Sequence, residues 1–187
     1  MNILIDNKII NFDKEDFPML FSGKALVHSG ASMFSVSLMT KLFEKGEKIV
    51  FFTAFPQAKE LFREQLKDKI DENIIIIESG DEDTFIEELN KIKDLDERIV
   101  LFKNIENYSH KIFDKLKDHK LTIFSGDIDT CRFADELMKK EFKTKIFFSQ
   151  SEKYPQEGMD NLPKYYGKIT NEKYNGVLSL DIDKANI

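Results

Sequence analysis

The sequence predicts an α/β domain with a mostly parallel central sheet, helices on both faces and an antiparallel hairpin at its C-terminal end. From Lys24 onward, short apolar runs alternate with amphipathic stretches, a pattern typical of βα units. Some of these runs are continuously apolar, as strands covered on both faces are. With 187 residues, 41% of them hydrophobic, the chain is long enough for one core. We therefore expect a single three-layer domain over 1–187, with its core at about 17–183.

Each predicted element follows from a local pattern. Apolar runs predict strands at 25–28, 48–53, 73–78, 98–102, 121–124 and 145–149, and residues 1–11 favour a further short strand. Helical spacing of apolar residues predicts helices at 34–44, from Pro56 onward, at 85–92, 112–116 and 133–138. The order of these elements predicts a regular series of strand–helix units.

The last part of the chain has a different pattern. Residues 150–162 contain proline, glycine and asparagine, which predicts a turn-rich loop. Two apolar stretches, at 165–170 and 177–183, predict a terminal hairpin over about 164–183. They are joined through Asn171 to Gly176, where the dipeptide Asn175–Gly176 is a good turn signal.

Charge and cysteine content limit the classes of function. The net charge of −6 argues against a surface devoted to nucleic acid, although a local basic patch is compatible with this average. No apolar run is long enough for a membrane span, and the first residues do not resemble a secretion signal. The lone Cys131 cannot form an internal disulfide, which suits a reducing compartment. We expect a cytoplasmic protein, with Cys131 as a buried small hydrophobe.

A degenerate phosphate loop lies between the first predicted strand and helix. A working loop needs glycines that let backbone N–H groups surround phosphate, a lysine for the β and γ oxygens, and a Ser or Thr for magnesium. Residues 28–35 have the right length and place, yet His28 and Met33 replace the glycines and Phe34 replaces the lysine. The groups left for an anion are Ser29, Gly30, Ser32 and Ser35.

The second half of an ATPase site is also changed. An acid at the end of an apolar strand normally orders magnesium. The matching strand, at 98–102, is followed by Lys103. Because both halves have lost their chemistry, we predict no magnesium-dependent ATP hydrolysis, no catalytic residues, no cofactor and no metal.

The order of elements resembles the RecA/KaiC superfamily of P-loop ATPases from about Phe17 to Ile182. The resemblance is carried by residues 28–35, by Phe51–Ala54 after the second strand, and by the terminal hairpin. It implies a degenerate member that lacks the Walker A lysine and the Walker B acid. It also implies assembly, because RecA-like domains commonly pack as rings, filaments or dimers, and inactive members serve as accessory subunits.

Other polar residues could form a crevice site at the strand ends, where α/β ligands bind. Asp127 and Asp129 could serve as acids or metal ligands, but capping of the next helix is the favoured interpretation. Glu106 could replace the missing acid, but a solvated loop residue is favoured. His28 borders the degenerate loop, and with Phe34 and Lys103 it completes the set of possible crevice residues. The three histidines are too scattered for a zinc site.

Two further features bear on nucleic acid. Tyr165 and Tyr166 could stack bases, although paired tyrosines on a strand more often put one ring in the core and one on the surface. A solvated helix face adequately explains the four nearby lysines, at positions 139, 140, 143 and 145.

Three functional hypotheses follow. The first is a catalytically inactive domain that acts as a protein-interaction or assembly subunit, through a sheet edge or the terminal hairpin. The second is a protein or enzyme that binds a nucleotide or another small molecule in the crevice. The third is an accessory subunit that binds tRNA or DNA, which the acidic charge makes the least favoured.

Overall fold

The computed structural model describes residues 2–5, 8–24, 30–54, 73–159, 162–163 and 165–181, with side chains undescribed at 2, 30–33, 36 and 181. Its strands are β1 (Asn2–Ile5), β2 (Lys8–Ile9), β3 (Met19–Ser22), β4 (Ile49–Thr53), β5 (Ile74–Glu78), β6 (Ile99–Lys103), β7 (Thr122–Gly126), β8 (Thr144–Phe147), β9 (Tyr166–Asn171) and β10 (Asn175–Asp181). Its α-helices are α1 (Gly30–Glu44), α3 (Glu82–Lys91), α4 (His110–Leu116) and α5 (Ala134–Lys139). Short 3-10 helices cover Lys14–Asp16, Leu95–Glu97 and Ile105–Asn107.

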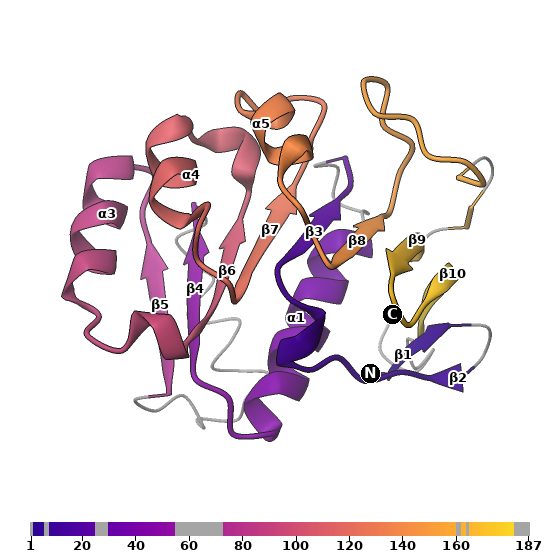
Figure 1. Ribbon diagram of the computed structural model, residues 1–187, viewed down its shortest axis with the longest axis horizontal. Coiled ribbons are helices and arrows are strands. Elements are labelled where there is room, and N and C mark those ends of the chain that lie inside the picture. Colours follow the sequence, from indigo (N-terminus) through magenta and orange to yellow (C-terminus); the bar gives the residue numbers. More distant parts are fainter. Residues whose placement is uncertain are drawn as a thin grey trace.

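All described strands belong to one sheet, in the order β2-β1-β10-β9-β8-β3-β7-β6-β4-β5. The six strands from β8 to β5 pair in parallel, whereas β9, β10, β1 and β2 pair antiparallel and form what we call the wing. Figure 1 shows the wing at one side of the molecule and β5 with α3 at the other. The prediction of an α/β fold with a mostly parallel sheet and a terminal hairpin is therefore confirmed.

The two faces of the sheet bury alternate residues of each strand. In β3, Met19 and Phe21 pack in the same core as α1, whereas Leu20 packs in a second core with α3, α4 and α5. This alternation follows from the two-residue period of a strand. The inner face of the wing joins the α1 core through Ile3, Ile5, Ile169, Leu178 and Leu180. No helix of the described residues is both long and apolar enough to cross a membrane.

The start of the parallel sheet differs from the sequence prediction. The strand that precedes α1 is Met19–Ser22, which is buried throughout and pairs with both β7 and β8. The strand predicted at 25–28 lies outside the described residues, as does the helix predicted after Pro56. Helix α1 begins at Gly30, four residues before its predicted start.

The hairpin turn lies within the predicted connection at 171–176, but not at the dipeptide Asn175–Gly176. Asn175 and Gly176 belong to β10. The chain instead turns just after Asn171, whose side-chain oxygen accepts hydrogen bonds from the N–H groups of Lys173 (2.8 Å) and Tyr174 (2.6 Å). The hairpin lies between β8 and β1, so neither of its long sides is a free sheet edge.

Candidate functional site

The parallel strands place a topological switch between β3 and β7. The chain leaves β3 for α1 on one face of the sheet and leaves the neighbouring β7 toward α5 on the other face. In open α/β sheets, ligands bind where the connections diverge in this way, at the carboxyl ends of the strands. The candidate site is therefore formed by the start of α1 and by the loops that follow β6 and β7.

The degenerate phosphate loop does not form a loop over its described part. Residues 30–35 already belong to α1, whereas a phosphate loop keeps its glycine-rich residues outside the helix so that their N–H groups surround the ligand. His28 and Ser29 lie outside the described residues, and Gly30 and Ser32 are described by their backbone alone.

Phe34, at the position of the P-loop lysine, is a core residue with no exposed surface. Its ring meets that of Phe21 edge-on, with centroids 4.8 Å apart, and contacts Phe12 at 6.0 Å and Phe148 at 5.5 Å. The ring therefore packs between α1 and the sheet, whereas the lysine of a working loop extends toward phosphate. The sequence showed the substitution but not that Phe34 joins the core.

Ser35, at the position of the magnesium-binding hydroxyl, is fully buried. Its hydroxyl oxygen lies 3.2 Å from that of Ser125 on β7, within hydrogen-bond distance. Lys103 is directly opposite Ser125 in the pairing of β6 with β7, so the two side chains emerge on the same face about 5 Å apart. Lys103 thus brings a positive charge to the strand end that carries this hydroxyl pair, which disfavours a divalent cation there.

Lys103 itself is a half-buried cation. Burial lowers the pKa of its ammonium, and the carboxylate of Glu106 partly offsets this effect. Among the described residues, no group forms a hydrogen bond or ion pair with Lys103. The next residue, Asn104, adopts a left-handed conformation (φ 62°), and its buried side-chain oxygen has no hydrogen-bond donor within the described part of the chain.

Glu106 and Asp127 join the loops after β6 and β7. Glu106 Oε2 accepts a hydrogen bond from the N–H of Asp127 (3.0 Å). Gly126 permits this contact, because a Cβ there would lie 2.2 Å from Glu106 Oε2 and 2.9 Å from the backbone nitrogen of Ile105. Glu106 is thus half-buried and bonded, and the prediction of a solvated loop residue is wrong.

Asp129 anchors the 150–162 loop. Its carboxylate accepts hydrogen bonds from Ser151 Oγ (2.6 Å) and from the N–H groups of Glu152 (3.0 Å) and Lys153 (3.2 Å). Burial raises the pKa of Asp129, but these hydrogen bonds lower it more, so the net shift is downward. The predicted capping of the next helix by Asp129 is wrong, because α5 follows Phe133 and has no side-chain cap.

The remaining candidates have structural roles. Burial raises the pKa of the Cys131 thiol to about 12, in agreement with the predicted small hydrophobe. His119 bonds to Thr122 and to a main-chain carbonyl, and no three potential metal ligands gather among the described residues. Lys139 lies in α5 but Lys145 in β8, so the four lysines do not share one helix face as predicted.

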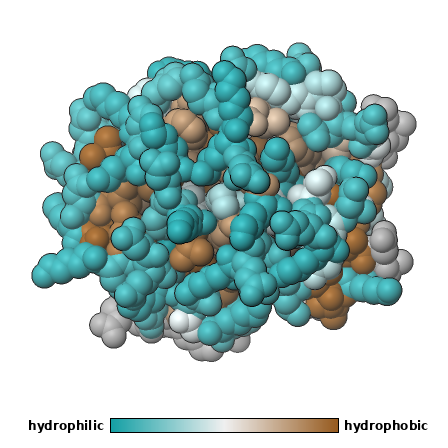
Figure 2. All heavy atoms as spheres, in the orientation of Figure 1, coloured by the Kyte–Doolittle hydropathy of each residue, from teal (hydrophilic) through white to brown (hydrophobic). Residues whose placement is uncertain are grey.

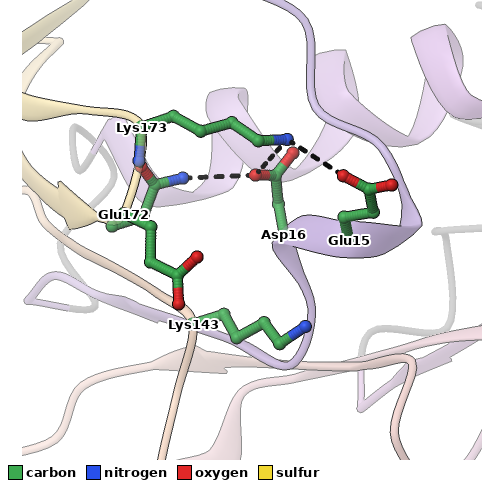
Figure 3. A pocket seen from close by; sticks show the side chains of 6 residues that line it. Glu15, Asp16, Lys143, Glu172 and Lys173 are labelled. Atoms are coloured by element: carbon green, nitrogen blue, oxygen red, sulfur yellow. Dashed lines mark hydrogen bonds and ion pairs between the residues drawn. The ribbon is translucent and has the colours of Figure 1, made fainter.

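A polar cleft of about 210 Å³ lies at the opposite end of β3 and β8 (Figure 3). Its buried member, Asp16, accepts hydrogen bonds from the Asp13 N–H (3.0 Å) and Asn171 Nδ2 (3.3 Å) and pairs with Lys173 Nζ (3.2 Å). Lys143, Glu172 and Glu15 complete the rim. Sequence reasoning missed this cluster, because nothing local links Asp16 to residues in the last hairpin.

Comparisons with protein-family models, with curated proteins and with solved structures give no match to this chain. The candidate site thus stands on its own geometry. It combines a buried phenylalanine, a bonded serine pair and a lysine that has no ion-pair partner among the described residues, at the place where a nucleotide site would need a phosphate loop and an acid.

Proposed function

We propose that this chain is a catalytically inactive RecA-like domain that acts as an assembly subunit and pairs with a second copy of itself through the outer edge of β5. The observation that carries the proposal is the buried ring of Phe34 in a helix that already includes residues 30–35. Neither a phosphate cradle nor a magnesium acid is then available for ATP hydrolysis. The central position of β3, with α1 beginning at the switch point, supports the resemblance to RecA-like domains.

The outer edge of β5 supports the assembly role. The Asn73 carbonyl and the Ser79 N–H both bond to β4. Because successive residues of a strand direct these groups to opposite sides, the N–H and C=O groups of Ile74 and Ile76 point away from β4. No described strand pairs with this side. An apolar edge without proline or lysine is a template for pairing with another strand.

A second copy of this chain can pair with the outer edge of β5. About a two-fold axis at Ile76, the two β5 strands run antiparallel, and each isoleucine pairs with an isoleucine or with a flanking residue of the other copy. The half-buried Ile75 and Ile76 then supply apolar surface on both faces of the joined sheet. The result is one continuous sheet across two subunits.

Ile76→Pro tests this assembly. Proline removes an N–H that points outward, so it blocks edge pairing without removing a hydrogen bond to β4. Multi-angle light scattering is expected to give a dimer for the wild type and a monomer for Ile76→Pro. The control Ile76→Ala retains the N–H and is expected to remain largely dimeric. A monomeric wild type at about 100 µM would refute the β5 interface, since a stable interface binds more tightly than that.

A second candidate function is the binding of a small anion in the crevice, which is favoured by Lys103, a half-buried lysine without an ion-pair partner among the described residues. A phosphate or carboxylate would neutralise its half-buried ammonium. Differential scanning fluorimetry with inorganic phosphate, ADP and citrate is expected to raise the melting temperature of the wild type and not of Lys103→Met. Equal shifts in both proteins would exclude Lys103 as the anion site.

A further inference from the structure

The outer face of the wing lacks the helical cover that its inner face has. Register places Leu4, Ile9, Tyr166, Lys168, Thr170, Val177 and Ser179 on this outer face, and it places Lys145 of the neighbouring β8 on the same side of the sheet. The wing residues that alternate with them are buried against α1. Helices α3, α4 and α5 pack on the parallel strands, and none of the wing's own residues belongs to their core. Within the described chain, the outer face is therefore an uncovered β-sheet surface beside a helix-covered one.

An aromatic ring stands out on this surface. Tyr166 is 38% exposed and Ile9 58% exposed, and they are the exposed large hydrophobics found among the described residues. Both lie on one cross-strand row, Ile9–Leu4–Ser179–Tyr166. Figure 2 shows apolar atoms gathered over the wing at one side of the molecule. Tyr165, the residue before Tyr166, instead packs against the α1 core. The predicted division of the tyrosine pair between core and surface is therefore confirmed.

Two lysines lie on the same side of the sheet as this row, Lys168 one cross-strand row away from Tyr166 and Lys145 two rows away. Lys145 pairs with Thr170 and Lys168 with Phe147, which makes the two lysines diagonal neighbours on β8 and β9. Neither forms an ion pair with a described residue. Among the described side chains of the wing strands, the register places no acid on this face. The chain has 34 acidic residues and 28 basic ones, so two neighbouring lysines without an acid beside them among the described residues are unusual. They favour an anionic binding partner.

We propose that the outer face of the wing binds single-stranded nucleic acid, with a base stacked on Tyr166 and backbone phosphates on Lys145 and Lys168. An exposed aromatic on an open sheet, next to lysines, is how sheet-based modules hold unstacked bases. A second copy seated on the same face would bury both lysines without carboxylates, which is costly. The net charge of −6 opposes the binding of long polyanions. We therefore infer that the site binds a short segment of nucleic acid with modest affinity.

Fluorescence anisotropy with a labelled oligothymidylate of about 20 nucleotides tests this, in the monomeric Ile76→Pro background so that β5 pairing plays no part. Two phosphate contacts predict that log K falls with log salt at a slope of about −1.4, since single strands give about 0.7 per contact. Lys168→Gln is expected to reduce the slope to about −0.7. Tyr166→Ala is expected to weaken binding about tenfold, and Tyr166→Phe to leave it nearly unchanged.

Lys139→Gln is the matched control, because it removes an exposed lysine of α5 away from the wing. Its affinity and salt slope should equal those of the parent. The proposal fails if the parent does not bind at low salt, or if Lys139→Gln changes the slope as much as Lys168→Gln. It also fails if Tyr166→Ala alters the mass in light scattering and leaves oligonucleotide affinity unchanged, because the face would then be a self-association surface.

Discussion

Phe34→Ala is expected to lower the free energy of unfolding by about 3–5 kcal/mol, the largest effect we predict for one residue. The side chain is fully buried and touches three other rings, so its removal costs transfer free energy and leaves a cavity. For a chain of this size the melting temperature should fall by roughly 10 °C. Denaturant titration followed by circular dichroism measures the free energy directly.

Two companion variants separate packing from phosphate chemistry. Phe34→Leu keeps most of the apolar volume and should cost only about 1–2 kcal/mol. Phe34→Lys restores the residue of a working loop, but its ammonium would enter the α1 core, so this variant should be less stable than Phe34→Ala. Isothermal titration with ATP and magnesium should show no binding to either protein. A stable Phe34→Lys that binds ATP would contradict the core position of Phe34.

Asp16→Ala is expected to cost about 3 kcal/mol, the second largest effect. Asp16 is 3% exposed and accepts from the Asp13 N–H, from Asn171 and from Lys173. Without the carboxylate, the 3-10 helix at Lys14–Asp16 loses its reciprocal cap and its link to the last hairpin. Thermal and denaturant unfolding should both show the loss.

Two more exposed neighbours of Asp16 provide control variants for Asp16→Ala. Lys173→Ala should cost less than Asp16→Ala, because the Lys173 side chain is 42% exposed and Asn171 still donates to the carboxylate. Glu15→Ala removes a neighbouring acid whose side chain is 83% exposed and should change stability by less than about 0.5 kcal/mol. If Asp16→Ala were as mild as Glu15→Ala, the buried cluster would contribute nothing to stability.

Continuous apolar runs explain why the parallel strands could be predicted. A strand buried on both faces needs apolar residues at every position, so the runs within β5 and β6 were recognisable without their neighbours. The sequence did not predict β3, because two apolar runs precede α1 and composition cannot tell which one pairs with β7 and β8. Within the predicted connection at 171–176, the turn does not fall on Asn175–Gly176, because the side chain of Asn171 stabilises a turn directly after it.

The candidate site was predictable in position but not in contacts. Lys103 and Asp127 could be assigned to strand ends, since the boundaries of β6 and β7 follow from local patterns. The bond from Ser151 to Asp129 and that between Ser35 and Ser125 join segments far apart in the chain. Such pairings depend on the three-dimensional packing of loops, which residue types alone do not encode at a local level.

The pairing of β1 with β10 has a consequence for the order in which the molecule forms. Ile3 pairs with Leu180, so one side of β1, the first described strand, can form its hydrogen bonds only after β10, the last one, has been synthesised. During synthesis, the parallel strands and α1 can already associate while the side of β1 that pairs with β10 is still without a partner. Contacts of such long sequence separation form slowly. The wing is thus the last part of the sheet to close, and its apolar strands are the ones exposed longest to other nascent chains.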